Sequence, residues 1–105
     1  MENDVVVTTI LDHCGMKSED VLFIGRRSNW KVSRARHLIK YFLYTYQELS
    51  TPCIHRLMGE RSSGFDHAST LHSIRTVRDQ PALFMDDVIE IRVLLDESCS
   101  KKEIN

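Results

Sequence analysis

Segment 65–78 carries polar side chains whose types and spacing suit contact with a nucleic acid. The pattern predicts a helix capped by Asp66, because a carboxylate there accepts hydrogen bonds from first-turn N–H groups that lack partners. The first turn then presents His67, Ala68 and Ser69 at the positively polarised end of the helix. Such an end can receive a phosphate, and short polar side chains there can reach a base edge. The alternative interpretation is an ordinary surface helix with a capped first turn.

The charge of the chain is distributed unevenly along its length. Residues 1–25 hold one Lys and five acids, a net charge of −4, and residues 79–105 also carry −4. Residues 26–78 hold ten Lys or Arg and three acids, a net charge of +7. A basic middle between acidic ends favours a surface that binds a polyanion. The alternative is a solvated helix surface whose arginines pair with acids elsewhere.

Length and composition bound the class of protein. The 105 residues, 42% of them hydrophobic and 28% charged, predict one globular domain over 1–105, with a core over about 5–95. Only four Gly and two Pro are present, which favours helices over a turn-rich β domain. Three Cys without a C-x-x-C pair predict reduced thiols in a cytoplasmic protein. No apolar run reaches the ~18 residues that a membrane span needs, and no signal peptide is expected.

The sequence lacks the motifs of common enzymes. It has no Gly-rich phosphate loop and no G-x-S-x-G, so we expect no enzymatic activity, no cofactor and no small-molecule substrate. His67 and His72 are five residues apart and fall on different faces of a helix. Without an H-x-x-x-H or paired Cys, we expect no metal site.

Apolar spacing predicts about six helices and therefore an all-α fold class. The central helix covers about residues 31–49, because one stripe of its residues repeats at helical spacing. The stripe consists of Val32, Ala35, Ile39, Phe42, Leu43, Tyr46 and Leu49. Trp30 is expected to pack where this helix starts, and the alternative is contact with the DNA backbone. Arg34, Arg36 and His37 lie in its first turns, off or beside the stripe.

Shorter helices flank the central one, each with its own start and stop signals. The signals are Asn3 or Asp4 and Gly15 for the first, Ser18 and Gly25 for the second, and Ser50 or Thr51, Pro52 and Gly59 for the fourth. The expected core faces are Val7, Ile10, Leu11 and Cys14 in the first, Val21, Leu22 and Ile24 in the second, Ile54, Leu57 and Met58 in the fourth, and Leu71, Ile74 and Arg78 with Val77 in the fifth.

The last helix is expected to follow Pro81 and to be acidic on its exposed side. Its core face comprises Phe84, Val88, Ile91 and Leu95, and its exposed acids are Asp86, Asp87 and Glu90. Residues 100–105 are expected to fray. The two short helices before it, separated by the loop 59–64, suggest a helix-turn-helix whose second helix enters the major groove.

Three ordered segments match the pattern of a known family. They are DHASTLH at 66–72, which looks like D-H-[TS]-[TS]-V-x-[HY], VSRARH at 32–37, which looks like V-A-R-x-[RQ]-x, and the start of the fourth helix at 50–54, which looks like S-[LYF]-x-x-I. On these segments the chain resembles the carboxy-terminal DNA-binding domain of DnaA, the bacterial chromosomal replication initiator, over about residues 5–95.

This resemblance implies a tryptophan-repressor-like helix-turn-helix that binds double-stranded DNA, and it links the chain to DNA replication and the replication origin. Arg34 would reach into the minor groove, which suits Arg where the groove is narrow and negative. The other implied contacts are Asp66, His67 and Ala68 in the major groove, Ser69 near phosphate, Thr51 and Pro52 beside the backbone, and Arg26, Arg27 and Lys31 at further phosphates, with Arg36 and His37 on the same basic stretch. Because the chain begins at Met1 without room for the ATPase domain of the initiator, a stand-alone DNA-binding module is expected.

Three features depart from the family pattern. Ala68 stands where a Thr usually helps to read a base, and Ala can touch a thymine methyl but cannot hydrogen-bond. Phe65 replaces a common basic residue, and the loop 59–64 carries about four more residues than the family pattern. These departures fit an alternative, a protein-interaction module that keeps the fold without base readout and whose acidic terminal helices form the partner face.

Overall fold

The computed structural model describes residues 2–21, 30–58 and 66–104, with the helical backbone alone at 66–68 and 100–104. These residues form six helices and no strand, which confirms the all-α expectation. The helices are α1 (Asn3–Cys14), α2 (Ser18–Val21), α3 (Trp30–Thr45), α4 (Thr51–Leu57), α5 (Asp66–Asp79) and α6 (Pro81–Ile104). Within these ranges, no helix is both long enough and apolar enough to cross a membrane.

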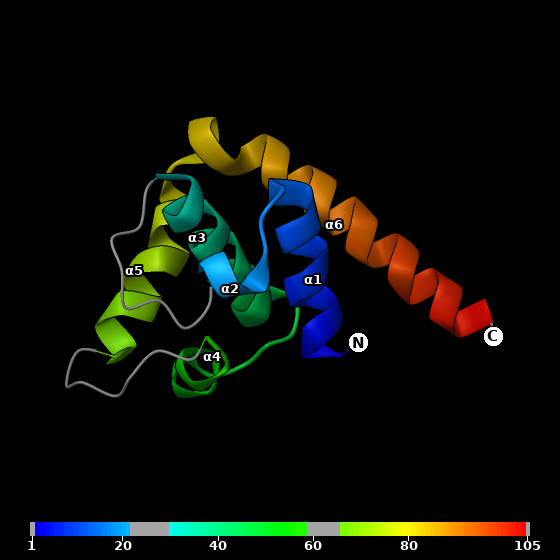
Figure 1. Ribbon diagram of the computed structural model, residues 1–105, viewed down its shortest axis with the longest axis horizontal. Helices are drawn as coiled ribbons and strands as arrows, with labels where there is room; N and C mark the ends of the chain where they lie inside the picture. Colours follow the sequence, from blue (N-terminus) through cyan, green and yellow to red (C-terminus); the bar gives the residue numbers. More distant parts are fainter. Residues whose placement is uncertain (1, 22–29, 59–65, 105) are drawn as a thin grey trace.

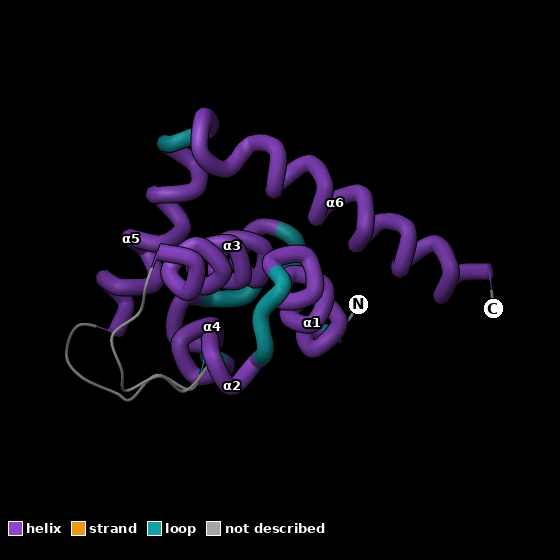
Figure 2. Tube along the Cα trace, turned by 45° about the horizontal axis from the view of Figure 1, so that its top comes forward, coloured by secondary structure: helices purple, strands orange, loops and turns teal. Residues whose placement is uncertain are grey.

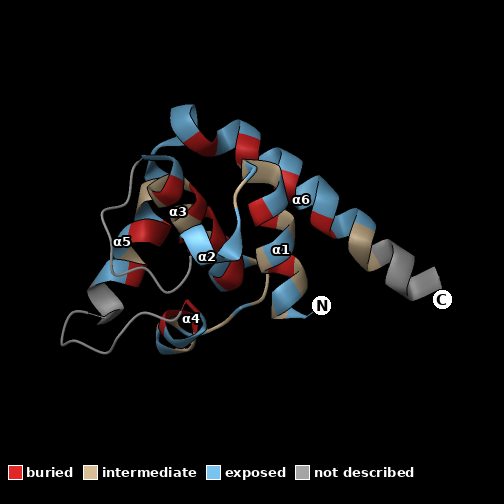
Figure 3. Cartoon of the chain, viewed as in Figure 1, coloured by how far each residue is buried: buried red, intermediate tan, exposed pale blue. Residues whose placement is uncertain are grey.

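Helix α3 lies at the centre of the fold. It packs against α1, α2, α4 and α5, and its contact with α5 is the most extensive (Figure 1). Helix α6 packs against α1 and α5 and then continues beyond α1 to the carboxyl end of the chain (Figures 1 and 2). The buried residues therefore gather between α3 and its neighbours, and one side of α6 is exposed over residues 81–97 (Figure 3).

The predicted core stripe of α3 is confirmed over most of its length. Its five residues from Val32 to Leu43 are buried, and Leu38 and Lys40 join them. The helix ends at Thr45, four residues earlier than predicted, because the chain turns through Glu48, whose φ of 56° is left-handed. The Leu49 N–H then donates to the Leu43 carbonyl at 3.0 Å, so the turn folds back on the helix end.

Helix α1 ends as predicted but begins differently. Gly15 adopts the left-handed conformation, with φ 67°, that favours glycine at this position. The N-cap is Glu2, without a side-chain hydrogen bond, so the predicted capping by Asn3 or Asp4 is wrong. The Asn3 side chain instead accepts a hydrogen bond of 2.8 Å from the Gln47 amide. The core face of α1 also differs from the predicted one. Ile10 and Leu11 are buried as predicted, Val6 is buried in addition, and Val7 and Cys14 are only partly buried.

The start of α4 follows the sequence prediction. Ser50 is the N-cap, its hydroxyl accepts from the Cys53 N–H at 3.4 Å, and Pro52 lies in the first turn. Ile54 and Met58 are buried, whereas Leu57 is 39% exposed, so its predicted inward orientation is wrong.

The second helix is only partly described. In α2, Ser18 is the first helical residue and Val21 is buried. The predicted residues Leu22, Ile24 and Gly25 lie outside the described residues, as does Gly59, the expected stop of α4.

The core face of α5 is shifted by one residue from the prediction. Thr70, Ser73, Ile74 and Val77 are buried at i, i+3, i+4 and i+7, while Leu71 is half-buried and Arg78 is exposed. Two hydroxyl side chains therefore occupy a face that an apolar pattern does not reveal. Ser73 is accommodated there because it hydrogen-bonds with His37 of α3 at 2.8 Å.

Helix α6 buries an acid that was expected at the surface. Phe84, Ile91 and Leu95 are buried and Val88 partly so, as predicted, and Asp86 and Glu90 are exposed. Asp87 is buried against α1 and α3, so its predicted exposure is wrong. The helix also continues to Ile104, across residues that were expected to fray.

Candidate nucleic-acid interface

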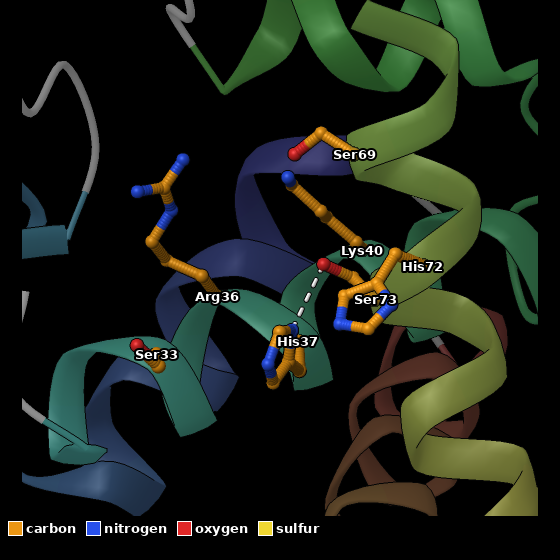
Figure 4. A pocket seen from close by; sticks show the side chains of 7 residues that line it. All are labelled: Ser33, Arg36, His37, Lys40, Ser69, His72 and Ser73. Atoms are coloured by element: carbon orange, nitrogen blue, oxygen red, sulfur yellow. Dashed lines mark hydrogen bonds between the residues drawn. The ribbon is translucent and has the colours of Figure 1, made fainter. Parts of the chain in front are cut away.

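The contact between α3 and α5 forms a small polar pocket of about 150 Å³ (Figure 4). Its lining comprises Ser33, Arg36, His37 and Lys40 from α3 and Ser69, His72 and Ser73 from α5. The four α3 residues fall at i, i+3, i+4 and i+7, and the three α5 residues at i, i+3 and i+4, so each set occupies one face of its helix. Two basic side chains, two imidazoles and three hydroxyls therefore converge on one cavity.

Three of the predicted site residues meet in this pocket, namely Arg36, His37 and Ser69. The other four, Ser33, Lys40, His72 and Ser73, are not among the site residues predicted from the sequence. Their helical spacing from the predicted residues was the signal in the sequence that could have identified them. Spacing alone does not predict which face of each helix lines the pocket, because that depends on how α3 and α5 pack.

His37 lies between the pocket and the apolar core. Its Nδ1 hydrogen-bonds with the Ser73 hydroxyl at 2.8 Å, and its ring centroid lies 6.2 Å from that of His72 and 6.4 Å from that of Phe84. Burial, the largest cause, and the nearby His72, Lys40 and Arg36 together lower the pKa of His37 to about 4. The imidazole is therefore held neutral in a surrounding that disfavours additional positive charge and favours an anion.

Arg34 does not line the polar pocket. Its guanidinium forms an ion pair with Asp87 and lies over the Trp30 ring, with its Cζ 5.5 Å from the ring centroid. The expectation that Trp30 packs into the protein at the start of α3 is wrong, because the residue is 68% exposed. Asp87 also accepts a hydrogen bond of 2.9 Å from His13 Nε2, so one carboxylate joins α1, α3 and α6. In this arrangement an acid of α6 compensates the charge of Arg34.

The remaining predicted contacts are distributed around the α3–α5 pair. Lys31 is exposed in the first turn of α3, and Thr51 and Pro52 begin α4, which packs against α5. Asp66, His67 and Ala68 form the first turn of α5, and their side chains lie outside the described part. Arg26 and Arg27 lie outside the described residues altogether. The roles of all of these residues in DNA contact stay predictions.

No protein-family model, curated protein or solved structure matches the chain. In the described ranges, no group of three or more His, Cys, Asp or Glu side chains is arranged to hold a metal ion. The three cysteines are free thiols of intermediate burial.

The lowered pKa of His37 predicts a loss of stability in acid. The folded state binds a proton with a pKa of about 4 and the unfolded state with one near 6.5. Between these values the unfolded state holds more protons, so stability falls as pH falls from about 6.5 towards 4. We expect a loss of about 1–2 kcal/mol after allowing for solvent screening of this partly exposed ring.

Urea unfolding at pH 7 and pH 4.5 measures this loss. The His37→Gln variant serves as reference, because it keeps a polar side chain that does not titrate. The wild type should lose more stability than this variant between the two pH values. Equal losses would mean that His37 is not a source of the acid sensitivity.

Proposed function

We propose that the protein binds double-stranded DNA and places a backbone phosphate in the pocket between α3 and α5. The observation that carries this proposal is the convergence of Arg36 and Lys40 with the Ser69 and Ser73 hydroxyls around one small cavity. Phosphate oxygens accept hydrogen bonds from such groups, and charge-assisted bonds are the stronger ones. The net charge of +7 on residues 26–78 supports the same polyanionic ligand.

The finer features of the proposal follow from the resemblance to the DnaA carboxy-terminal domain. Helices α4 and α5 would act as the helix-turn-helix, with the first turn of α5, from Asp66 to Ser69, in the major groove. Ser69 lies in this turn and also lines the pocket, so a phosphate held there would fix the register of α5 on the duplex. Lys31, Thr51 and Pro52 would lie beside the backbone. Arg34 would reach the minor groove only after leaving Asp87.

Titration with duplex DNA at several salt concentrations tests the proposal. Each neutralised phosphate should contribute ~0.9 to the slope of log affinity against log salt. Arg36→Ala should lower the affinity about fivefold, or ~1 kcal/mol, and should reduce the slope. Arg92→Ala on α6 is the matched control, since Arg92 is exposed but outside the pocket. Equal effects of the two substitutions, or a signal that is independent of salt, would count against the proposal.

A protein-interaction function is the second candidate, and one observation favours it. Helix α6 exposes five large apolar side chains, Leu83, Met85, Ile89, Val93 and Leu94. Exposed apolar residues along one helix are typical of contact surfaces between proteins. A protein that shows no salt-dependent DNA signal but retains a protein partner after nuclease treatment would support this candidate over the first.

A further inference from the structure

A second, larger pocket lies beside the polar one. It has a volume of about 300 Å³, at the lower end of the range of small-molecule sites. Its lining comprises Trp30, Ser33, Arg34, His37, Thr76, Gln80, Leu83 and Phe84. The Trp30 and Leu83 side chains are 68% and 65% exposed, so this mainly apolar surface is open to a ligand.

His37 forms the boundary between the two pockets. His37 and Ser33 line both of them. The His37 ring makes an edge contact with His72 of the polar pocket and another with Phe84 of the apolar pocket, at 6.2 and 6.4 Å between centroids. A ligand that spans His37 would therefore have an anionic group on one side and an apolar group on the other.

The apolar pocket has the features of a site for a planar ring. The Arg34 guanidinium lies over the Trp30 indole, and such cationic and aromatic planes stack on nucleobases. At the rim, the Gln80 amide supplies both a donor and an acceptor for the edge of a base. An aliphatic side chain of a phosphorylated peptide would use neither the stacking planes nor the amide.

We propose that the two pockets together bind one unpaired nucleotide, with its phosphate in the polar pocket and its base against Trp30. A base inside a duplex is paired and stacked on both faces, so the ligand is a single strand or an unpaired end. The phosphate contact rests on the proposed function, whereas the base contact is additional to it. The protein would thus hold an unpaired nucleotide at the pocket that duplex DNA uses for a backbone phosphate.

Trp30 is the only tryptophan of the chain, so its fluorescence reports directly on the base site. The probes are a short oligothymidylate, thymidine 5′-monophosphate, thymidine and inorganic phosphate. We expect saturable quenching by the first two, at least tenfold weaker binding of thymidine, and no quenching by inorganic phosphate. Quenching that is equal for thymidine and its monophosphate, or absent for both phosphate-bearing thymidine probes, would overturn the proposal.

A matched pair of substitutions on α6 locates the base site. Leu83→Glu places a carboxylate in the apolar pocket, and Ile89→Glu places one at a similarly exposed position outside it. We expect Leu83→Glu to weaken oligothymidylate binding at least tenfold and Ile89→Glu to change it less than twofold. Equal effects of the two variants would overturn the proposal. A phosphoserine peptide that competes with an affinity equal to that of the oligonucleotide would also overturn it.

Duplex binding by the same variants separates the two proposals. Leu83→Glu should leave the affinity for duplex DNA within twofold of the wild type, because the polar pocket is unchanged. Duplex binding without any quenching by oligothymidylate would overturn the nucleotide site and leave the duplex proposal standing. If the wild type does not bind duplex DNA but is quenched by oligothymidylate, and Leu83→Glu abolishes this quenching, the result would support the nucleotide site and reject the duplex proposal.

Discussion

Replacement of Asp87 by alanine is expected to lower the free energy of unfolding by about 3 kcal/mol. The Asp87 side chain is only 8% exposed, and it forms an ion pair with Arg34 and a hydrogen bond of 2.9 Å with His13. Without the carboxylate, both groups would lose their shared acceptor, and the His13 side chain would lose it at a position that is only 14% exposed. For a domain of about this size the loss corresponds to a fall in melting temperature of at least about 10 °C.

Asp86 provides the matched control for this experiment. It is the neighbouring residue on α6, carries the same side chain and is exposed. Asp86→Ala should therefore change stability by no more than about 0.5 kcal/mol. Urea unfolding of both variants measures the difference, and the double variant Arg34→Ala/Asp87→Ala should lose less than the sum of the single losses. Equal midpoints for Asp86→Ala and Asp87→Ala would show that the carboxylate does not hold the three helices together.

Local signals in the sequence were sufficient to predict the helices and several of their ends. The stripe of α3 is long and strongly periodic, so its burial followed from spacing alone. The Ser50 cap of α4 and the left-handed Gly15 after α1 are also local features, because each depends on backbone groups within a few residues. Helix α3 was predicted too long because Tyr46 and Leu49 still contact the core from the turn that follows it.

Contacts between distant residues determined what the sequence did not reveal. Asp87 is buried where it bonds Arg34 of α3 and His13 of α1. These partners lie 53 and 74 positions away in the sequence, so no pattern within α6 distinguishes Asp87 from Asp86. The face of α5 was predicted from its apolar residues, but the Ser73 hydroxyl is buried through its bond to His37, 36 positions away. The same long-range contact forms the polar pocket.

The assignment of Arg34 shows how a residue-level prediction depends on its surroundings. Its position in the first turns of a basic helix is consistent with a DNA contact. In the structure its guanidinium contacts Asp87 and Trp30, and neither contact is visible from spacing. Arg36, two positions later, lies on the side of α3 that faces the polar pocket. A helix turns by about 100° per residue, so two nearby arginines have different surroundings.

Ser69→Glu is expected to reduce the affinity for duplex DNA about 30-fold, or ~2 kcal/mol at low salt, because like charges that meet across an interface repel. Ser69 is exposed at the polar pocket, where the proposed phosphate would lie (Figure 4). A glutamate there would bring its carboxylate to the position of the phosphate. It should not unfold the protein, because an acid near the amino end of α5 interacts favourably with the helix dipole.

Two control variants separate the local charge from size and from net charge. Ser69→Gln has the same length as the glutamate but is neutral, so its loss of affinity should be no more than about threefold, since it adds no like-charge repulsion. Thr8→Glu adds the same charge at an exposed position of α1, outside the pocket. Fluorescence anisotropy with labelled duplex DNA measures all three, and the effect of Ser69→Glu should shrink as salt is raised because screening weakens the repulsion. Equal losses for Ser69→Glu and Thr8→Glu would mean that the phosphate is not bound between α3 and α5.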